Sequence, residues 1–134
     1  MGTGSESKDN ASTQWKAAFA PIEAADRAAI EVFLDTLADH VAEPWTLGSM
    51  AEECGVARTR FAHHCKAITN ATPMEYLRRI RIAHAAALLT TRPDLSITEI
   101  CFASGFSSSQ YFATVFRREQ AISPSAYRAR IASR

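Results

Sequence analysis

The chain has 134 residues, 47% of them hydrophobic, and a formal net charge of +1, which suits one small domain with a modest core. It has no apolar run approaching the roughly 18 residues of a membrane-spanning helix, and its N-terminus lacks the apolar stretch of a secretion signal. Three irregularly spaced cysteines argue against a disulfide scaffold. We therefore expect a soluble, cytoplasmic protein with reduced thiols.

The small net charge hides an asymmetry along the chain. Residues 1–57 carry three Lys/Arg against ten Asp/Glu, whereas residues 58–134 carry twelve against four. A basic half with few carboxylates is what a polyanion-binding surface requires. Arg-rich helical faces are also often only solvated, so charge alone leaves nucleic-acid binding open.

Residues 1–25 are interpreted as a disordered tail or the remnant of a linker, because they begin with a polar stretch rich in Gly, Ser and Thr. A domain is expected over residues 26–132. Its first helix is predicted over residues 26–42, where Ile30, Leu37 and Val41 are among the apolar residues at helical spacing and Pro44 ends the pattern.

Two later segments share one layout. Residues 46–69, the first module, are predicted to form two short helices around Gly55, with Thr46 as the first cap and the second helix at about 58–69. Residues 96–119, the second module, repeat this layout around Gly105, with the second helix at about 108–119. Two short helices joined by a Gly-containing turn are typical of a helix-turn-helix.

A linker helix is predicted between the modules, over about residues 72–90. Thr72, Pro73 and Glu75 have the spacing of a capping box with proline at the first helical position. One apolar face is expected from Tyr76, Leu77, Ile80, Ala83, Ala87 and Leu88. A helix of roughly 17 residues would hold the modules about 25 Å apart.

The two modules also repeat residue by residue. Phe61 and Phe112, Lys66 and Arg117, and Tyr76 and Tyr127 are each 51 positions apart, whereas Gly55 and Gly105 are 50 apart. The difference indicates one residue inserted after the second glycine. We therefore expect two equivalent binding modules rather than a longer repeat array.

These spaced motifs resemble the DNA-binding domain of the AraC/XylS family of bacterial transcription regulators. The likeness covers roughly residues 30–130 and rests on the T-P-x-E-Y-L-x-x-x-R-I-x-x-A run from Thr72, the I-x-x-I-C-F-A-S-G-F run from Ile97, and the closing S-P-x-x-Y-R from Ser123. It implies an all-α, homeodomain-like fold of about seven helices, with two helix-turn-helix subdomains joined by a long helix. It also implies sequence-specific binding of double-stranded DNA by two recognition helices in adjacent major-groove segments.

The resemblance also implies the contact residues. The family pattern places seven side chains against bases: Thr59, Ala62, His63, Ser109, Gln110, Ala113 and Thr114. It places six more near phosphates or the groove edge: Arg58, Arg60, Lys66, Ser108, Arg117 and Arg118. Gln110 is chemically the best single reader, because a Gln amide can pair bidentately with adenine.

Some positions depart from the family pattern. His63 and Thr114 stand where Arg is common, and Ala62 and Ala113 offer only apolar contact, so DNA shape and phosphate contacts are expected to carry more of the specificity. Ala57 replaces the usual Ser cap of the first recognition helix, which should weaken that helix start by about 0.5 to 2 kcal/mol. The first module is therefore expected to be looser than the second.

Other chemistries fit the sequence poorly. His63, His64 and Cys65 are adjacent, but neighbouring helical residues point about 100° apart and cannot all converge on one metal ion. We therefore expect no metal, cofactor or catalytic residue. Arg81 falls within the apolar stretch of the linker helix, and we expect it to be an internal anchor or an ion-pair partner. Five aromatic residues are expected mostly in the core: Phe61, Tyr111, Phe112, Phe116 and Tyr127.

Three functions remain as hypotheses. The first is a DNA-binding regulator of transcription, an activator with RNA polymerase as a second partner, associated with the nucleoid and monomeric as this domain. A dimer would then form through a further domain. The second is a helical protein-interaction adaptor derived from the same fold without DNA binding. The third, a small enzyme, is disfavoured because no acid/base or nucleophile constellation can be assembled.

Overall fold

The computed structural model describes residues 22–133, and most of the predicted tail lies outside that range. The described residues form seven α-helices and a short 3-10 helix, and they include no strand. This confirms the predicted all-α fold. After a helix over residues 22–37, the elements are η1 (Ala38–His40), α2 (Leu47–Glu53), α3 (Arg58–Thr69), α4 (Pro73–Thr91), α5 (Ile97–Ala103), α6 (Ser109–Gln120) and α7 (Pro124–Ala132).

The first helix differs from its prediction at both ends. Residues 22–25 are already helical, and the α-helix ends at residue 37 with η1 completing the stretch. The early start follows from the many alanines around Asp26 and Arg27, which favour helix without showing any apolar period. Apolar periodicity alone therefore placed the start too late.

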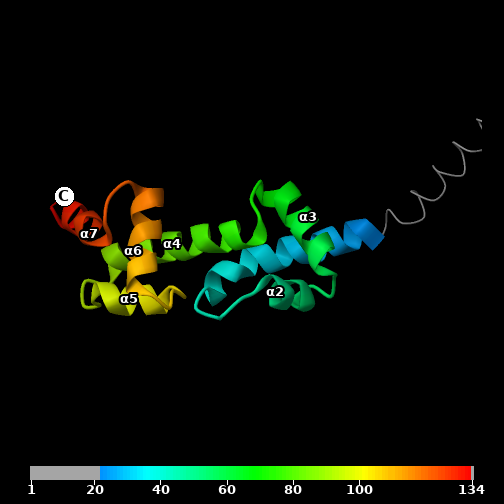
Figure 1. The fold of residues 1–134 in the computed structure, drawn as a ribbon, viewed down its shortest axis with the longest axis horizontal. Coiled ribbons are helices and arrows are strands. Elements are labelled where there is room, and N and C mark those ends of the chain that lie inside the picture. The colour runs from blue at the N-terminus through cyan, green and yellow to red at the C-terminus, as the bar shows by residue number, and fades with distance from the viewer. Residues whose placement is uncertain (1–21, 134) are drawn as a thin grey trace, which may run out of the picture.

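Within residues 22–133 the side chains form two hydrophobic cores that share α4. The first core gathers Ile30, Leu34, Leu37, Met50, Ala51, Phe61, Cys65 and Leu77. The second gathers Ile82, Ala85, Ala86, Leu89, Ile100, Cys101, Phe106, Phe112, Val115 and Phe116. In Figure 1, α2 and α3 lie toward one end of α4, and α5, α6 and α7 toward the other. The long helix is therefore the strut between the two modules.

The buried face of α4 corrects the predicted one. Ala83 and Ala87 are exposed, whereas Ile82, Ala85, Ala86 and Leu89 are buried. A single straight apolar stripe was the wrong assumption, because α4 turns Leu77 to the first core and the residues from Ile82 onward to the second. The helix has 19 residues, which corresponds to about 28 Å.

The predicted Thr72 cap is confirmed, but only half of the predicted capping box forms, because no bond runs from the Glu75 side chain back to the Thr72 amide. The Glu75 amide donates to Thr72 Oγ1 over 3.2 Å, and the Glu99 amide donates to Ser96 Oγ over 3.0 Å. A full capping box forms instead at α2, where Thr46 and Ser49 bond each other in both directions. Ala57 gives α3 no side-chain cap, as expected.

Both turns of the helix-turn-helix motifs need their glycine. Gly55 has φ of +68° and Gly105 has φ of +92°, a region that side chains with a Cβ rarely adopt. The turn after Gly105 is one residue longer than the turn after Gly55, so the inserted residue lies where the sequence offset placed it. Among residues 22–133, no helix combines the length and apolar character that crossing a bilayer would need.

Candidate nucleic-acid interface

The second helix of each module is the candidate recognition helix. α3 and α6 are both 12 residues long, begin 51 positions apart and end in a left-handed residue, Asn70 with φ of 59° and Ala121 with φ of 69°. Each buries one face in its own core, through Phe61 in α3 and Phe112 in α6. The opposite faces therefore point away from both cores.

Those outer faces carry the side chains that the resemblance assigns to bases. Six of them are exposed, namely Thr59, His63, Ser109, Gln110, Ala113 and Thr114, and Ala62 is half-buried. Six of the seven fall in register at the offset of 51, since Thr59 corresponds to Gln110, Ala62 to Ala113 and His63 to Thr114. The structure thus brings the predicted readers onto two equivalent helical surfaces.

The predicted phosphate contacts are accessible with one exception. Arg58, Lys66, Ser108, Arg117 and Arg118 are exposed. Arg60 is half-buried, and its Nε lies 2.8 Å from Asp26 Oδ2, while its Nη2 lies 3.9 Å from Glu23 Oε1. Sequence reasoning missed this ion pair, because the carboxylates come from a helix more than 30 residues earlier. The acidic N-terminal helix therefore offsets part of the charge of Arg60.

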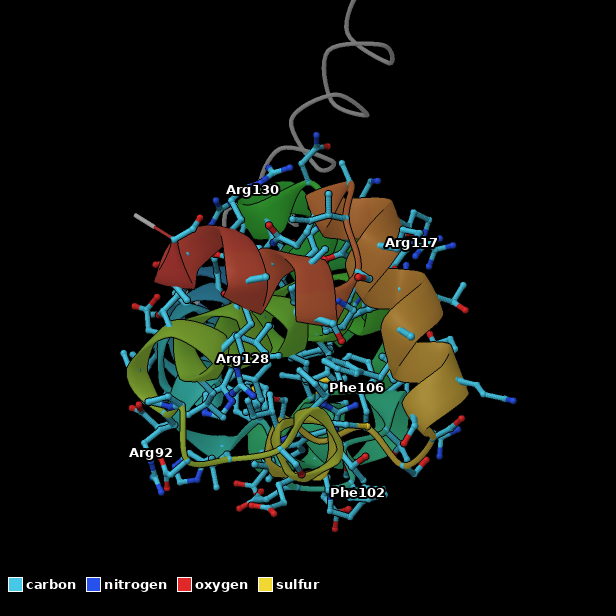
Figure 2. All side chains as sticks on the ribbon, turned by 90° about the vertical axis from the view of Figure 1, so that its left-hand side faces the viewer. Arg92, Phe102, Phe106, Arg117, Arg128 and Arg130 are labelled. Carbon is cyan, nitrogen blue, oxygen red and sulfur yellow. The ribbon has the colours of Figure 1, made fainter. Side chains whose placement is uncertain are left out.

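The start of α6 shows how these side chains are held. Ser108 Oγ accepts a hydrogen bond from the Tyr111 amide over 3.2 Å, so this predicted phosphate contact also caps the helix. Thr114 Oγ1 donates to the Gln110 carbonyl over 3.0 Å, which leaves its lone pairs free to accept. Figure 2 shows Arg117 projecting outward from α6, while Phe106 points inward. The outer face of α6 is thus polar and basic.

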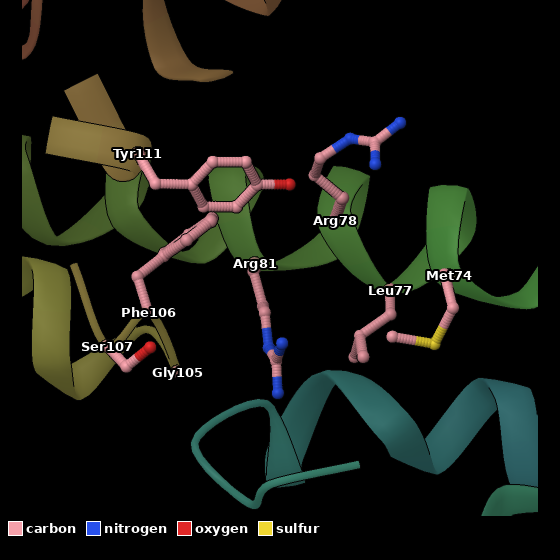
Figure 3. Close-up of a pocket in the computed structure, with 8 residues that line it drawn as sticks. All are labelled: Met74, Leu77, Arg78, Arg81, Gly105, Phe106, Ser107 and Tyr111. Atoms are coloured by element: carbon pink, nitrogen blue, oxygen red, sulfur yellow. The ribbon is translucent and has the colours of Figure 1, made fainter. Parts of the chain in front are cut away.

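A hollow lies beside α4 between the two cores, with Met74 and Leu77 on one side and Phe106 and Tyr111 on the other (Figure 3). Arg81 lies along its wall, and burial lowers the pKa of its guanidinium. Its Nε donates to the Val41 carbonyl over 2.9 Å, and Nη2 donates to the Glu43 carbonyl over 2.7 Å. This confirms Arg81 as an internal anchor.

Two further arginines tie α4 to the second module, and sequence reasoning gave neither this role. Arg78 Nε lies 3.9 Å from Glu119 Oε1 at the end of α6. Arg128 on α7 donates to the carbonyls of Leu89 over 3.5 Å and Arg92 over 3.1 Å. These carbonyls end α4, where a cation also meets the negative end of the helix dipole. Spacing alone could not separate these arginines from those available to DNA.

The aromatic residues mostly confirm their prediction. Phe61, Phe112 and Phe116 are buried, and the Tyr127 ring packs on Phe116 with centroids 5.5 Å apart. Tyr111 contradicts it, because 51% of its surface is exposed. Its ring only borders Phe106, at a centroid distance of 6.1 Å, since position 111 lies on the edge of α6 between the buried and the outer face.

Neither metal nor thiol chemistry gains support from the described residues. His63 is exposed while His64 and Cys65 are buried, and no group of three or more His, Cys, Asp or Glu among residues 22–133 is placed to hold an ion. Burial, with a smaller contribution from Glu53, raises the pKa of the Cys54 thiol to about 11. A thiol so protonated is a poor nucleophile at neutral pH.

Known proteins are similar to this chain in sequence and in fold. The family model of a helix-turn-helix domain matches residues 50–130. The HTH-type transcriptional regulator AlkR of Acinetobacter baylyi is 37% identical over 86 residues, which make up 64% of this chain and 28% of that protein. The HTH-type transcriptional activator RhaS of Escherichia coli O139:H28 is 35% identical over 95 residues, 71% of this chain and 34% of that protein. The chain thus spans about a third of the length of these relatives, or less.

Two solved structures extend the likeness. The DNA-binding domain of AdpA, a global transcriptional factor solved with a target DNA, superposes with a TM-score of 0.74 at 27% identity, over 78% of this chain and 93% of that one. An AraC-type regulator from Chromobacterium violaceum gives 0.72 at 27% identity, over 81% of this chain and 96% of that one. The chain belongs to the AraC-type helix-turn-helix family, whose domains are not enzymes but bind specific DNA sequences in the regulation of transcription.

Proposed function

We propose that residues 26–132 bind double-stranded DNA with α3 and α6 in adjacent major-groove segments. The observation that carries this proposal is the repetition of an exposed, polar outer face on two helices of equal length whose inner faces fill separate cores. An α-helix fits the major groove, where each base pair shows a distinct set of donors and acceptors. Two such helices on one strut can read two half-sites.

We assign different tasks to the two sets of side chains. Gln110 reads a base in the second half-site, and its exposed amide at the second position of α6 suits the bidentate pairing that adenine allows. Ala62 and Ala113 offer only apolar contact, for instance to a thymine methyl. The cations Arg58, Lys66, Arg117 and Arg118 set the position on the backbone and supply much of the affinity.

The wider cellular role is part of this proposal, and the name of one relative supports it. RhaS is named a transcriptional activator, and an activator at a bacterial promoter acts through RNA polymerase, which we infer as the second partner. The domain itself acts as a monomer, in the cytoplasm and on the nucleoid. Any dimer forms through a further domain, in keeping with the greater length of the relatives.

A DNA titration tests the proposal. The protein first enriches duplexes from a random pool. Fluorescence anisotropy then measures its affinity for an enriched duplex and for a shuffled duplex of equal length, at 50 and 200 mM salt. We expect tight binding to the enriched duplex, weaker binding to the shuffled one, and a loss of affinity at higher salt. An absence of binding at low salt would support the adaptor hypothesis instead, and equal affinity for both duplexes would contradict sequence-specific binding.

A further inference from the structure

The two cores meet at one position of the strut. Leu77 belongs to the first core and Ile82 and Ala85 to the second. Arg81 lies four residues after Leu77 and four before Ala85, on the helical stripe where a continuous core would place an apolar residue. A charged side chain therefore occupies the junction of the two modules.

Arg81 joins the strut to the segment leading into the first module. Segment 41–45 connects η1 to α2, and its carbonyls at Val41 and Glu43 accept hydrogen bonds of 2.9 and 2.7 Å from the guanidinium. Figure 3 shows the side chain reaching from α4 toward this loop. Hydrogen bonds from a charged donor are about twice as strong as neutral ones, so segment 41–45 is held against α4.

The turn of the second module approaches the same segment 41–45 and Arg81. A Cβ on Gly105 would collide with the Val41 carbonyl oxygen and lie 2.6 Å from Arg81 Nε. The equivalent Gly55 also has a positive φ, but a Cβ there would meet nothing within 4 Å. Gly105 is thus needed for its backbone conformation and also because the turn approaches segment 41–45 so closely.

We propose that Arg81, segment 41–45 and Gly105 form a clasp that fixes how the second module sits relative to the first, and so sets the half-site spacing the domain accepts. Arg81 and Gly105 act as positioning residues that need not touch DNA. The clasp rests on the proposed function, because it matters only if both recognition helices read one duplex. One extra base pair shifts a half-site by about 3.4 Å and rotates it by about 35°. Two modules in a fixed relative position cannot contact both half-sites after such a shift.

The test is a spacing profile. Half-sites are located on an enriched duplex by single-base substitution, and duplexes with one or two base pairs added or removed between them are titrated. We expect wild-type protein to lose at least tenfold in affinity for a change of one base pair. Arg81→Met and Gly105→Ala should bind the original duplex several-fold more weakly and change less than threefold across the series.

Matched variants separate the clasp from general damage. Gly55→Ala brings the same backbone strain without the contact to segment 41–45, and Arg79→Met removes an exposed cation from α4. Both should keep the steep wild-type profile. Arg81→Lys retains the charge and one hydrogen bond, and should give an intermediate profile if Arg81→Met does not fold.

Each outcome decides between the two proposals. If wild-type protein discriminates among sequences but its affinity does not change with the spacing of the half-sites, the clasp proposal is wrong, whether or not the variants fold. Folded Arg81→Met and Gly105→Ala proteins with a steep profile would also overturn it. A wild-type protein that binds no duplex, or all duplexes alike, would instead overturn the proposed function.

Discussion

The two modules share a layout but differ in how firmly the recognition helix is held. α6 starts from the Ser108 cap and packs Phe112 and Phe116 into a core of several rings, whereas α3 starts from Ala57 without a side-chain cap and has Cys65 where α6 has Phe116. In exchange, α3 is braced by the Arg60 ion pair with Asp26. The recognition helix of the second module is thus held by its own core, whereas that of the first module is also held by an ion pair with the N-terminal helix.

Removing the buried side chain at the equivalent position of each core gives the largest expected difference. Phe116 is fully buried, and the centroids of the Phe112 and Tyr127 rings lie within 5.7 Å of its ring centroid. Phe116→Ala should therefore lower the free energy of unfolding by about 3 to 5 kcal/mol. Cys65→Ala removes one buried sulfur and should cost about 1 kcal/mol. Urea denaturation followed by circular dichroism measures both. Equal losses would contradict the account of two differently packed cores.

The base readers should differ in what they discriminate. Gln110→Ala should cost about 1 to 3 kcal/mol of discrimination at one base pair, because it removes a bidentate partner. Thr59→Ala, at the equivalent position of α3, should cost less because a hydroxyl makes fewer hydrogen bonds. Titration of duplexes substituted one base at a time measures the effect. A uniform loss over all sequences from Gln110→Ala would show that Gln110 reads no base.

The cations should differ in salt dependence. Arg117→Ala should weaken binding to every duplex and reduce the slope of log affinity against log salt by about 1. Arg60→Ala should change the slope less, because Asp26 already offsets that charge. Titrations at four salt concentrations give both slopes, and Arg79→Ala on α4 serves as a control. If Arg60→Ala had the larger effect, the bracing role of its ion pair would be wrong.

Exchanging the caps should produce the smallest changes, with opposite signs. Ala57→Ser supplies the missing hydroxyl and should raise the free energy of unfolding by about 1 kcal/mol. Ser108→Ala removes the bond to the Tyr111 amide and should lower it by a similar amount. Thermal melts followed by circular dichroism are sufficient for this pair. A destabilised Ala57→Ser protein would mean that the start of α3 cannot accept a cap.

Local chemistry explains what the sequence could predict. Gly55, Gly105 and the Thr72 cap are short-range signals, and the structure confirms them. The ion pair of Arg60 with Asp26 and the approach of Gly105 to Val41 join residues 34 and 64 positions apart. The two burial directions of α4 likewise depend on the other helices that pack against it. Such contacts follow from the packing of distant helices, which periodicity within one helix does not encode.

The most direct test of two-helix binding is methylation interference on an enriched duplex, which reports contacts at guanine N7 in the major groove. If α3 and α6 both read DNA, interfering guanines should fall in two groups about 10 base pairs apart. One group of interfering guanines would contradict the account, because it would mean that only one of the two recognition helices enters the groove.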